Sequence, residues 1–462
     1  MMCLKLMFHQ IKMQLSKNKK YQFLFFLILS IYFIFNGGNS NLLIQFNFIF
    51  FGLLFLFCLR DKNYQQHFKN FYIKNKISLI FFLFFLFYLV LQILPLPLNI
   101  LKILSPVKFN ILNSLKSDTF FSSISLSPSN SLFQIFNVLT LLFVIFIMNM
   151  IFYTEKHRKR FYVFLSFSGF YLSFVAVILY LNGNPDIFFL KKLYYKDSST
   201  GFFVNRTAFS VFLLFCLISS LEVLKSLNRL KYANSNNFFL KIYIRLFVVF
   251  ITIGIITTFS RIGNFLLLLT ILIYLLNEFI FRPEKNKSFK LILILIVLID
   301  IFIIGYYFGS EKIVDRFNLL NEEFSNIEYS DYNLSRISLI KFSIFYLKDY
   351  LFFGYGLGGF ENLFKINFIN NTNFFADHAH SDIVEYIGSL GLIGFLLLIS
   401  CLTKFFFKIK INYININLFS YLFIILIFDF SLQIPIIQIL FIIFFILNNK
   451  ISTVPHKSVD RY

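Results

Sequence analysis

The sequence predicts an all-α polytopic membrane protein of about twelve transmembrane helices, with eleven as the alternative count. Apolar residues make up 58% of the chain and charged residues only 14%, whereas soluble domains are about 45–50% apolar and about 25% charged. The apolar residues are gathered in runs near the roughly 20 residues that span a bilayer as a helix. Lys and Arg concentrate in alternate loops between these runs. This composition excludes both a water-soluble domain and a disordered chain.

The predicted spans follow the apolar runs in chain order, and the final run contains two of them. The runs cover residues 21–35, 42–59, 77–94, 131–153, 161–181, 207–224, 242–259, 264–281, 289–308, 383–403 and 418–447. The final run is interrupted by Asp429, Gln433 and Pro435, so we expect two short helices joined by a tight outer turn. No small-residue cleavage site follows the first run, which is therefore interpreted as an anchor.

The distribution of positive charge predicts the orientation. If the N-terminus is cytoplasmic, the inner loops hold 28 of the 43 Lys and Arg residues and the outer loops hold 14, which agrees with the positive-inside rule. Residues 1–20 and 450–462 are then cytoplasmic tails. Residues 309–382 form one large outer loop within a single integral membrane domain, 1–462. The four cysteines form no CxxC pair, which disfavours disulfides and thiolate metal sites.

Three arginines lie on the outer face under this topology. Asn205–Arg206 begins a span, Ser260–Arg261 occupies a short turn between two spans, and Arg336 lies in the large outer loop. An arginine at a membrane boundary is costly unless it is paired or reaches the interface, so each is a candidate site residue. The alternative for Arg206 and Arg261 is contact with lipid phosphates. The alternative for Arg336 is a solvated or salt-bridged surface residue.

The histidine pair in Asp377-His-Ala-His-Ser-Asp382 permits two functional interpretations. His378, His380, Asp377 and Asp382 together include zinc-ligand types, but they are crowded into six residues. A neutral imidazole can instead accept a proton from a hydroxyl near neutral pH. A carboxylate such as Asp382 or Glu385 would orient the ring. The general-base interpretation is preferred, and no metal is expected.

Glycines cluster at two places near this motif. Gly354-Tyr-Gly-Leu-Gly-Gly359 has the look of a nucleotide-binding run, but it does not follow a strand in a βαβ unit. We therefore expect sharp turns and close packing there. Gly388, Gly391 and Gly394 give the following span a small-residue face for helix packing. Asp300, within another span, is an intramembrane acid whose role the sequence leaves open.

These residues, in this order, resemble the O-antigen ligase and O-antigen polymerase family of bacterial membrane glycosyltransferases. The resemblance extends over about residues 90–405. It is carried by Phe203-Val-Asn-Arg-Thr-Ala-Phe209, Thr258-Phe-Ser-Arg261, Phe353-Gly-Tyr-Gly-Leu-Gly-Gly-Phe360, Asp377-His-Ala-His-Ser-Asp382 and Ser123-Ile-Ser-Leu-Ser-Pro128. Thr207, Ile262 and Ser381 depart from the family pattern, and they lie beside the charged residues rather than on them.

The resemblance implies a C-type glycosyltransferase architecture in the inner membrane, with a periplasmic active site and no cofactor. It implies a metal-independent, inverting enzyme that moves a glycan from undecaprenyl diphosphate to an acceptor sugar hydroxyl of lipid A–core. Carried over by position, Arg206 and Arg261 bind the donor diphosphate and His380 is the base. Arg336, Asn205, His378 and Asp382 are supporting candidates.

Three alternatives stay open at this point. A polymerase of O-antigen or exopolysaccharide would use a second lipid-linked glycan as acceptor, and a third variant would glycosylate protein. A polysaccharide transporter or flippase is less favoured, because only Asp300 and the Asp429–Pro435 break place polar groups inside spans. Nucleic acid is not an expected partner, since the positive charge is explained by membrane topology.

Overall fold

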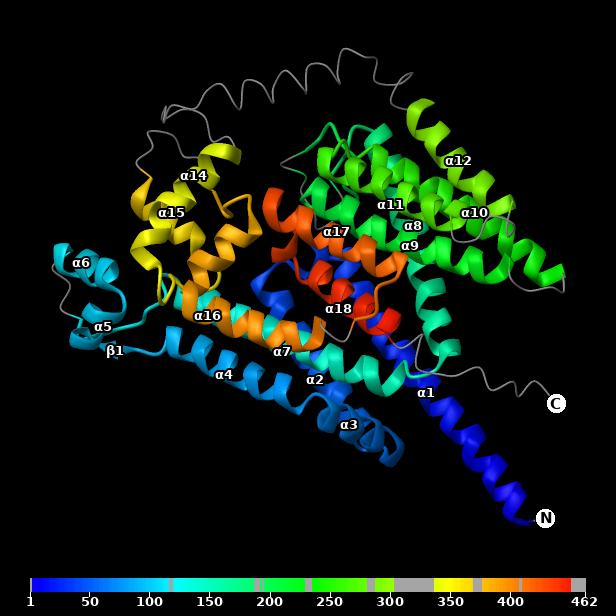
Figure 1. Ribbon diagram of the computed structural model, residues 1–462, viewed down its shortest axis with the longest axis horizontal. Helices are drawn as coiled ribbons and strands as arrows, with labels where there is room; N and C mark the ends of the chain where they lie inside the picture. The colour runs from blue at the N-terminus through cyan, green and yellow to red at the C-terminus, as the bar shows by residue number, and fades with distance from the viewer. Residues whose placement is uncertain are drawn as a thin grey trace.

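The computed structural model describes residues 2–115, 119–186, 192, 195–228, 235–280, 287–302, 336–368, 376–406 and 409–449. The chain is built almost entirely from helices (Figure 1). The long helices are α1 (Met2–Ile34), α2 (Asn41–Leu59), α4 (Lys76–Ile93), α7 (Pro128–Ile151), α8 (Glu155–Leu181), α9 (Arg206–Asn228), α10 (Ser235–Ile256), α11 (Arg261–Ile280), α12 (Lys287–Phe302), α16 (Asp382–Phe406), α17 (Tyr413–Phe428) and α18 (Pro435–Asn449).

The shorter elements connect these helices. They are η1 (Asn36–Gly38), α3 (Lys62–Lys74), β1 (Leu96–Pro97), α5 (Leu98–Leu104), α6 (Pro106–Ser114), β2 (Phe121–Ser122), α14 (Arg336–Leu347), η3 (Lys348–Tyr350), α15 (Phe360–Asn367) and η4 (Ser431–Gln433). The two strands form one antiparallel pair, with Leu96 opposite Ser122.

Within the described residues, each predicted apolar run lies on a long helix or, for the last run, on two; residues 303–308 of the run 289–308 lie outside the described part. In the part of the chain that the structure describes, eight helices are long and apolar enough to cross a membrane, namely those at 41–59, 76–93, 128–151, 155–181, 206–228, 238–256, 261–280 and 382–403. The all-α polytopic membrane class is confirmed. The count of twelve or eleven spans stays a prediction. Asp300 lies on α12, and its side chain is outside the described part.

The predicted break in the last apolar run is confirmed. Helix α17 ends at Phe428, the short η4 follows, and Pro435 opens α18. Proline suits the first position of a helix because its missing N–H is not needed there. The break produces the two short helices expected from the sequence, and it creates the turn on which much of the site is built.

Helix α9 is the centre of the bundle, and 94% of its most apolar stretch is buried. Its packing partners include α8 and α10 (Figure 1). The predicted span ended at residue 224, but the helix continues to Asn228 and buries Lys225. This ammonium pairs with Glu278 of α11 at 2.5 Å and lies 4.1 Å from the ring centroid of Tyr413. Because both charges are paired, burial is tolerated at this end of the helix.

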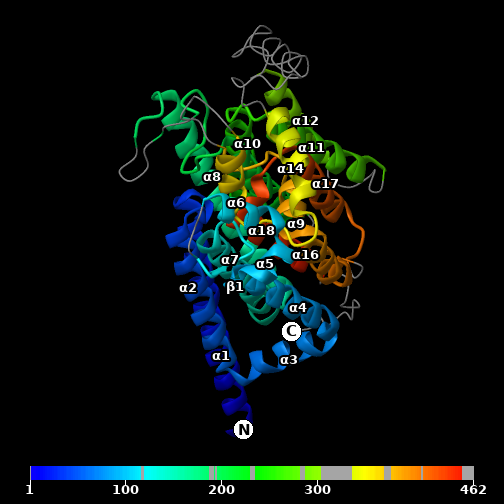
Figure 2. The ribbon, with the colours of Figure 1, turned by 90° about the vertical axis from the view of Figure 1, so that its left-hand side faces the viewer.

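The other end of the bundle carries the short helices α5, α6, α14 and α15, and Figure 2 looks onto it. Lys108 of α6 donates a hydrogen bond of 2.7 Å to the carbonyl of Ser123, which fixes the segment before α7. Within the predicted loop 309–382, residues 309–335 and 369–375 lie outside the described part. The rest includes α14 and α15, which share a small core built around Phe342, Phe360 and Phe364.

Candidate functional site

Arg206 is the first residue of the buried helix α9, and Arg261 is the first residue of α11. Asn205 precedes α9, and its Oδ1 accepts the N–H groups of Thr207 at 2.7 Å and Ala208 at 3.3 Å. This is a helix N-cap, which satisfies donors that the helix itself cannot. Asn205 was a supporting candidate from the sequence. Its side chain serves the start of α9 and thereby positions the neighbouring arginine.

The two arginine-bearing helix starts are joined directly. Ser260 accepts the N–H of Gly263 at 3.2 Å, and its hydroxyl donates to the hydroxyl of Thr207 at 3.1 Å. A side chain at Gly263 would begin 2.2 Å from Oγ of Ser210, so only glycine allows this approach of α11 to α9. Thr207, one of the departures from the family pattern, therefore has a packing role. The structure brings Arg206 and Arg261 to adjacent helix starts.

The environment of these arginines suits an anion. Arg261 is exposed and Arg206 is half-buried, and the guanidinium of Arg206 lies 5.0 Å from the ring centroid of Tyr195. Helix N-termini carry partial positive charge, and here the caps Asn205 and Ser260 already accept the N–H groups of Thr207, Ala208 and Gly263. Two guanidiniums beside two such termini form a cationic surface that can hold two phosphate groups by paired hydrogen bonds.

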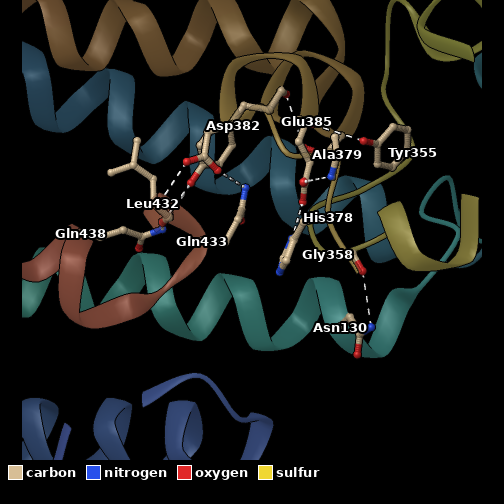
Figure 3. A network of polar contacts seen from close by, with 12 residues as sticks. Asn130, Tyr355, Gly358, His378, Ala379, Asp382, Glu385, Leu432, Gln433 and Gln438 are labelled. Atoms are coloured by element: carbon tan, nitrogen blue, oxygen red, sulfur yellow. Dashed lines mark hydrogen bonds and ion pairs between the residues drawn. The ribbon is translucent and has the colours of Figure 1, made fainter. Parts of the chain in front are cut away.

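The histidine motif forms a second cluster around Glu385 of α16 (Figure 3). Oε1 of this carboxylate lies 3.1 Å from Nδ1 of His378, and Oε2 accepts the N–H of Ala379 at 2.9 Å. Burial alone lowers the pKa of His378, but the negative charges of Glu385, Asp377 and Asp429 outweigh it and raise the pKa above its ordinary value. Glu385 thus orients His378, not His380.

His380 has a different environment from its neighbour. Its backbone adopts a left-handed φ of 58°, which is uncommon outside glycine. Its Nδ1 is buried and has no hydrogen-bond partner among the described residues. Burial, with smaller effects from Arg336 and His378, lowers the pKa of His380 to about 3. The imidazole is therefore neutral at physiological pH and keeps a free ring nitrogen.

Phe430 packs against both imidazoles. Its ring is stacked on His378 and edge-on to His380, with ring centroids 4.8 Å apart in each pair. Because Phe430 belongs to the turn between α17 and α18, this contact docks the histidine motif onto that turn.

Asp382 ties α16 to the same turn (Figure 3). Its carboxylate accepts the N–H of Leu432 at 3.0 Å and the side-chain amide of Gln433 at 3.1 Å. Its own N–H donates to the carbonyl of Asp429 at 3.0 Å. This supporting candidate therefore holds the backbone of the turn and does not contact a histidine ring in the structure.

Asp429 is a part of this cluster that the sequence reasoning treated only as a helix break. The residue is fully buried and accepts a hydrogen bond from the hydroxyl of Ser431. Burial raises the pKa of Asp429, and the charge of Arg336 opposes that shift. Arg336 therefore acts electrostatically on both Asp429 and His380. An acid inside an apolar run is the signal that could have identified Asp429.

The glycine run 354–359 forms turns, as predicted, and packs against a break in α16. Gly354 has a φ of 70°, and a Cβ there would lie 2.2 Å from the carbonyl oxygen of Ser389. Gly391, inside α16, has a φ of 65°, and a Cβ added there would clash with the carbonyl of Phe352. The small-residue face of α16 was expected to pack against a helix, but Gly391 contacts the backbone of the loop at Phe352 and Gly354. Gly394 meets the ring of Tyr88 on α4.

Two polar residues of α4 satisfy the carbonyls that this break exposes. The hydroxyl of Tyr88 lies 2.6 Å from the carbonyl oxygen of Leu390, and the amide of Gln92 donates to the carbonyl of Ser389 at 3.1 Å. Both side chains also reach the carbonyl of Phe353, at 2.8 and 2.7 Å. Backbone groups inside a membrane need such partners. Sequence reasoning missed both residues.

The two clusters are connected through the turn between α17 and α18. Ile434 packs on Gly37 of η1, where an added Cβ would lie 2.6 Å from Ile434 and 3.0 Å from the ring of Phe203. Phe203 comes two residues before Asn205, and Phe430 of the same turn contacts both histidines. One turn therefore contacts the histidine cluster directly and the arginine cluster through η1.

Metal-ligand types do not gather elsewhere. Among the residues that the structure describes, no group of three or more His, Cys, Asp or Glu side chains is arranged to hold a metal ion. His378 is committed to Glu385, and Asp382 is committed to the turn. The described residues supply two guanidiniums, a neutral imidazole and a histidine–carboxylate pair.

The fold is that of a polytopic α-helical membrane protein, and its described residues bring two arginines to adjacent helix starts and form a histidine–carboxylate cluster. Residues 246–399 match the family model described as O-antigen ligase. This match covers one third of the chain and supports its similarity to the O-antigen ligase family, a family of ligase- and polymerase-type glycosyltransferases. The matched range contains Arg261, Arg336 and His380, whereas Arg206 precedes it. A comparison with curated proteins finds no match to the chain.

Proposed function

We propose that this protein is a ligase-type glycosyltransferase that moves a glycan from undecaprenyl diphosphate to a sugar hydroxyl of lipid A–core. The reaction takes place on the periplasmic face of the bacterial inner membrane. The family match supports glycosyl transfer with a lipid-linked donor. The observation that carries the proposal is the hydrogen bond between Ser260 and Thr207, which joins the starts of the helices that bear Arg206 and Arg261.

The arginine pair binds the donor diphosphate. A guanidinium is planar, stays charged and can hold two phosphate oxygens at once. Arg206 and Arg261 together match the two phosphate groups of the carrier. As the bond between the sugar and the diphosphate breaks, negative charge grows on the leaving oxygen. Fixed cations at that point lower the barrier, so the arginines take the place that a divalent metal has in other diphosphate enzymes.

His380 is the general base. The acceptor hydroxyl attacks the anomeric carbon, a new carbon–oxygen bond forms, and the bond to the diphosphate breaks with its electron pair. The hydroxyl proton passes to the free nitrogen of His380. Attack opposite to the leaving group inverts the anomeric centre. The absence of a partner for Nδ1 among the described residues supports this role.

The lowered pKa of His380 fits a substrate-free site. A base with a pKa of about 3 is fully available for protonation at neutral pH but holds a proton weakly. The charge of Arg336 contributes to that low pKa. A diphosphate bound nearby would offset this positive charge and strengthen the base. The donor thereby prepares His380 for the proton transfer only when it is bound.

The acceptor is tested by deleting the gene and separating the surface glycans by gel electrophoresis. Uncapped lipid A–core with retained lipid-linked polymer supports the ligase. Core bearing single repeat units indicates a polymerase instead, and unchanged glycans contradict both functions. A purified protein that transfers glycan to lipid A–core in reconstituted vesicles would give independent support.

The orientation is tested by cysteine labelling from each side of the membrane. The proposal places positions 206, 261 and 380 on the periplasmic side and both termini in the cytoplasm. Single-cysteine variants at these positions, in a background without the native cysteines, are expected to react with an impermeant thiol reagent added outside the inner membrane. Reaction only from the cytoplasmic side contradicts the proposal.

A further inference from the structure

Arg206 has an aromatic partner that the reaction described above does not use. The ring centroid of Tyr195 lies 5.0 Å from the guanidinium carbon of Arg206, which is within the distance of a cation–π interaction. The backbone of Tyr195 is left-handed, with a φ of 55°. Such a conformation is unfavourable for a bulky residue and persists only where the surroundings hold it. The surroundings of Tyr195 therefore hold its backbone in this conformation.

A compact turn built on Asn184 fixes the segment around Tyr195. Asn184 is buried and also left-handed, with a φ of 53°. Its side-chain amide donates to the carbonyls of Lys196 and Ser198, the latter at 2.9 Å, and its Oδ1 accepts from the ammonium of Lys192. These bonds hold residues on both sides of Tyr195. These hydrogen bonds therefore hold the backbone next to Tyr195 and limit where its ring can lie.

The same segment is tied to the second arginine. The N–H of Ser199 donates to the carbonyl of Thr257 at 2.9 Å. Thr257 directly follows α10 and begins the short turn that leads to Arg261. The segment that carries Tyr195 therefore touches the turn of one arginine and covers the guanidinium of the other.

We propose that Tyr195 is a positioning residue for the donor diphosphate, a role that rests on the proposed function. Its ring occupies one face of the Arg206 guanidinium, and the N–H donors of that group lie in its plane. The contact with the ring therefore restrains the cation without using its N–H donors. A planar group held in this way loses less freedom when it binds a diphosphate.

The test changes the electron density of the ring while its size stays nearly constant. Phenylalanine and its mono-, di- and trifluorinated analogues are placed at position 195, and the Kd of geranylgeranyl diphosphate is measured in nanodiscs. We expect Tyr195→Phe to bind within about 2-fold of the wild type, and affinity to fall stepwise with each fluorine. Tyr195→Leu is expected to bind about 5-fold more weakly. Transfer at saturating donor is expected to keep its kcat while KM for the donor rises.

A flat fluorine series, or equal affinity of Tyr195→Leu and Tyr195→Phe, overturns the inference. Tyr171→Leu, at an exposed tyrosine of α8, is the matched control and is expected to bind like the wild type. The two proposals fail differently. If the wild type does not bind the prenyl diphosphate, the proposed function and this inference both fail. If the wild type binds it and only the series at position 195 is flat, this inference alone fails.

Discussion

Oε1 of Glu385 lies 3.1 Å from Nδ1 of His378, so one carboxylate acts on one histidine while its neighbour, two residues on, stays neutral. The pKa of His378 is raised and the pKa of His380 is lowered to about 3. Neighbouring groups whose pKa values are driven apart are typical of acid–base sites. The separation predicts distinct behaviour for variants at the two positions.

Glu385→Gln is expected to change how stability depends on pH. In the wild type, the raised pKa of His378 stabilises the folded protein. This stabilisation is complete at pH values below the ordinary histidine pKa of 6.5, and it is lost as the pH rises through the pKa of the folded state. Without the carboxylate charge, burial dominates and the pKa of His378 falls, so this loss disappears. Unfolding temperature measured in detergent across this pH range tests the change. Glu361→Gln, at an exposed pair with Lys365, is the control. An unchanged profile for Glu385→Gln contradicts the assignment.

His380→Asn is expected to reduce glycan transfer by roughly 100-fold or more, because the base is removed. Asparagine tolerates the left-handed backbone at this position, so the fold is retained. The donor Kd is expected to stay within about 2-fold of the wild type, since His380 acts on the acceptor. Steady-state transfer and donor binding are measured on the same preparation. A parallel loss of donor binding would falsify the base role.

Arg261→Lys is expected to weaken binding of the diphosphate donor about 10-fold or more, because an ammonium cannot form the paired hydrogen bonds of a guanidinium. Insertion and expression are expected to stay normal. Arg160→Lys, at a half-buried arginine that contacts Gln22, is the matched control. Calorimetric titration with a prenyl diphosphate checks both variants. Wild-type affinity in Arg261→Lys would show that Arg261 does not bind the diphosphate through paired hydrogen bonds.

Tyr88→Phe is expected to destabilise the protein by about 1–3 kcal/mol, because buried carbonyls at the break in α16 lose a donor. Thermal unfolding in detergent measures the effect. Tyr72→Phe removes a hydroxyl from an exposed tyrosine of α3 and is expected to be neutral. Equal stability of the two variants would show that Tyr88 does not support the break.

Chelation of divalent metals is expected to leave transfer unchanged, because the two arginines supply the charge that stabilises the leaving diphosphate. The assay is run with reconstituted protein before and after treatment with a chelator, followed by re-addition of Mg²⁺ or Zn²⁺. Activity that is lost on chelation and restored by one metal would return the histidine pair to the role of metal ligand.

The positions of the helices were largely predictable from the sequence. Apolar runs of the right length can only be buried in lipid or in one another, so their order marked each long helix. Pro435 and Asp429 marked the turn in the last run. Arg206 and Arg261 could be named as candidates because a cation at a membrane boundary is costly without a partner, and His380 could be named from the family resemblance.

The partners of these residues were not predictable. Whether Asp382 or Glu385 orients a histidine depends on the rotation of α16 and on the turn at Asp429–Gln433, and neither leaves a periodic signal. The break of α16 at Gly391, with Tyr88 and Gln92 as its donors, depends on contacts across several hundred residues.

The sequence by itself determined that the chain lies in a membrane, where its helices run and which reactive groups it carries, because hydropathy and charge act locally along the sequence. Tertiary structure alone decided which groups meet. A hydrogen bond such as the one from Ser260 to Thr207 exists only once two distant helices have packed, and packing depends on the shapes of many side chains together.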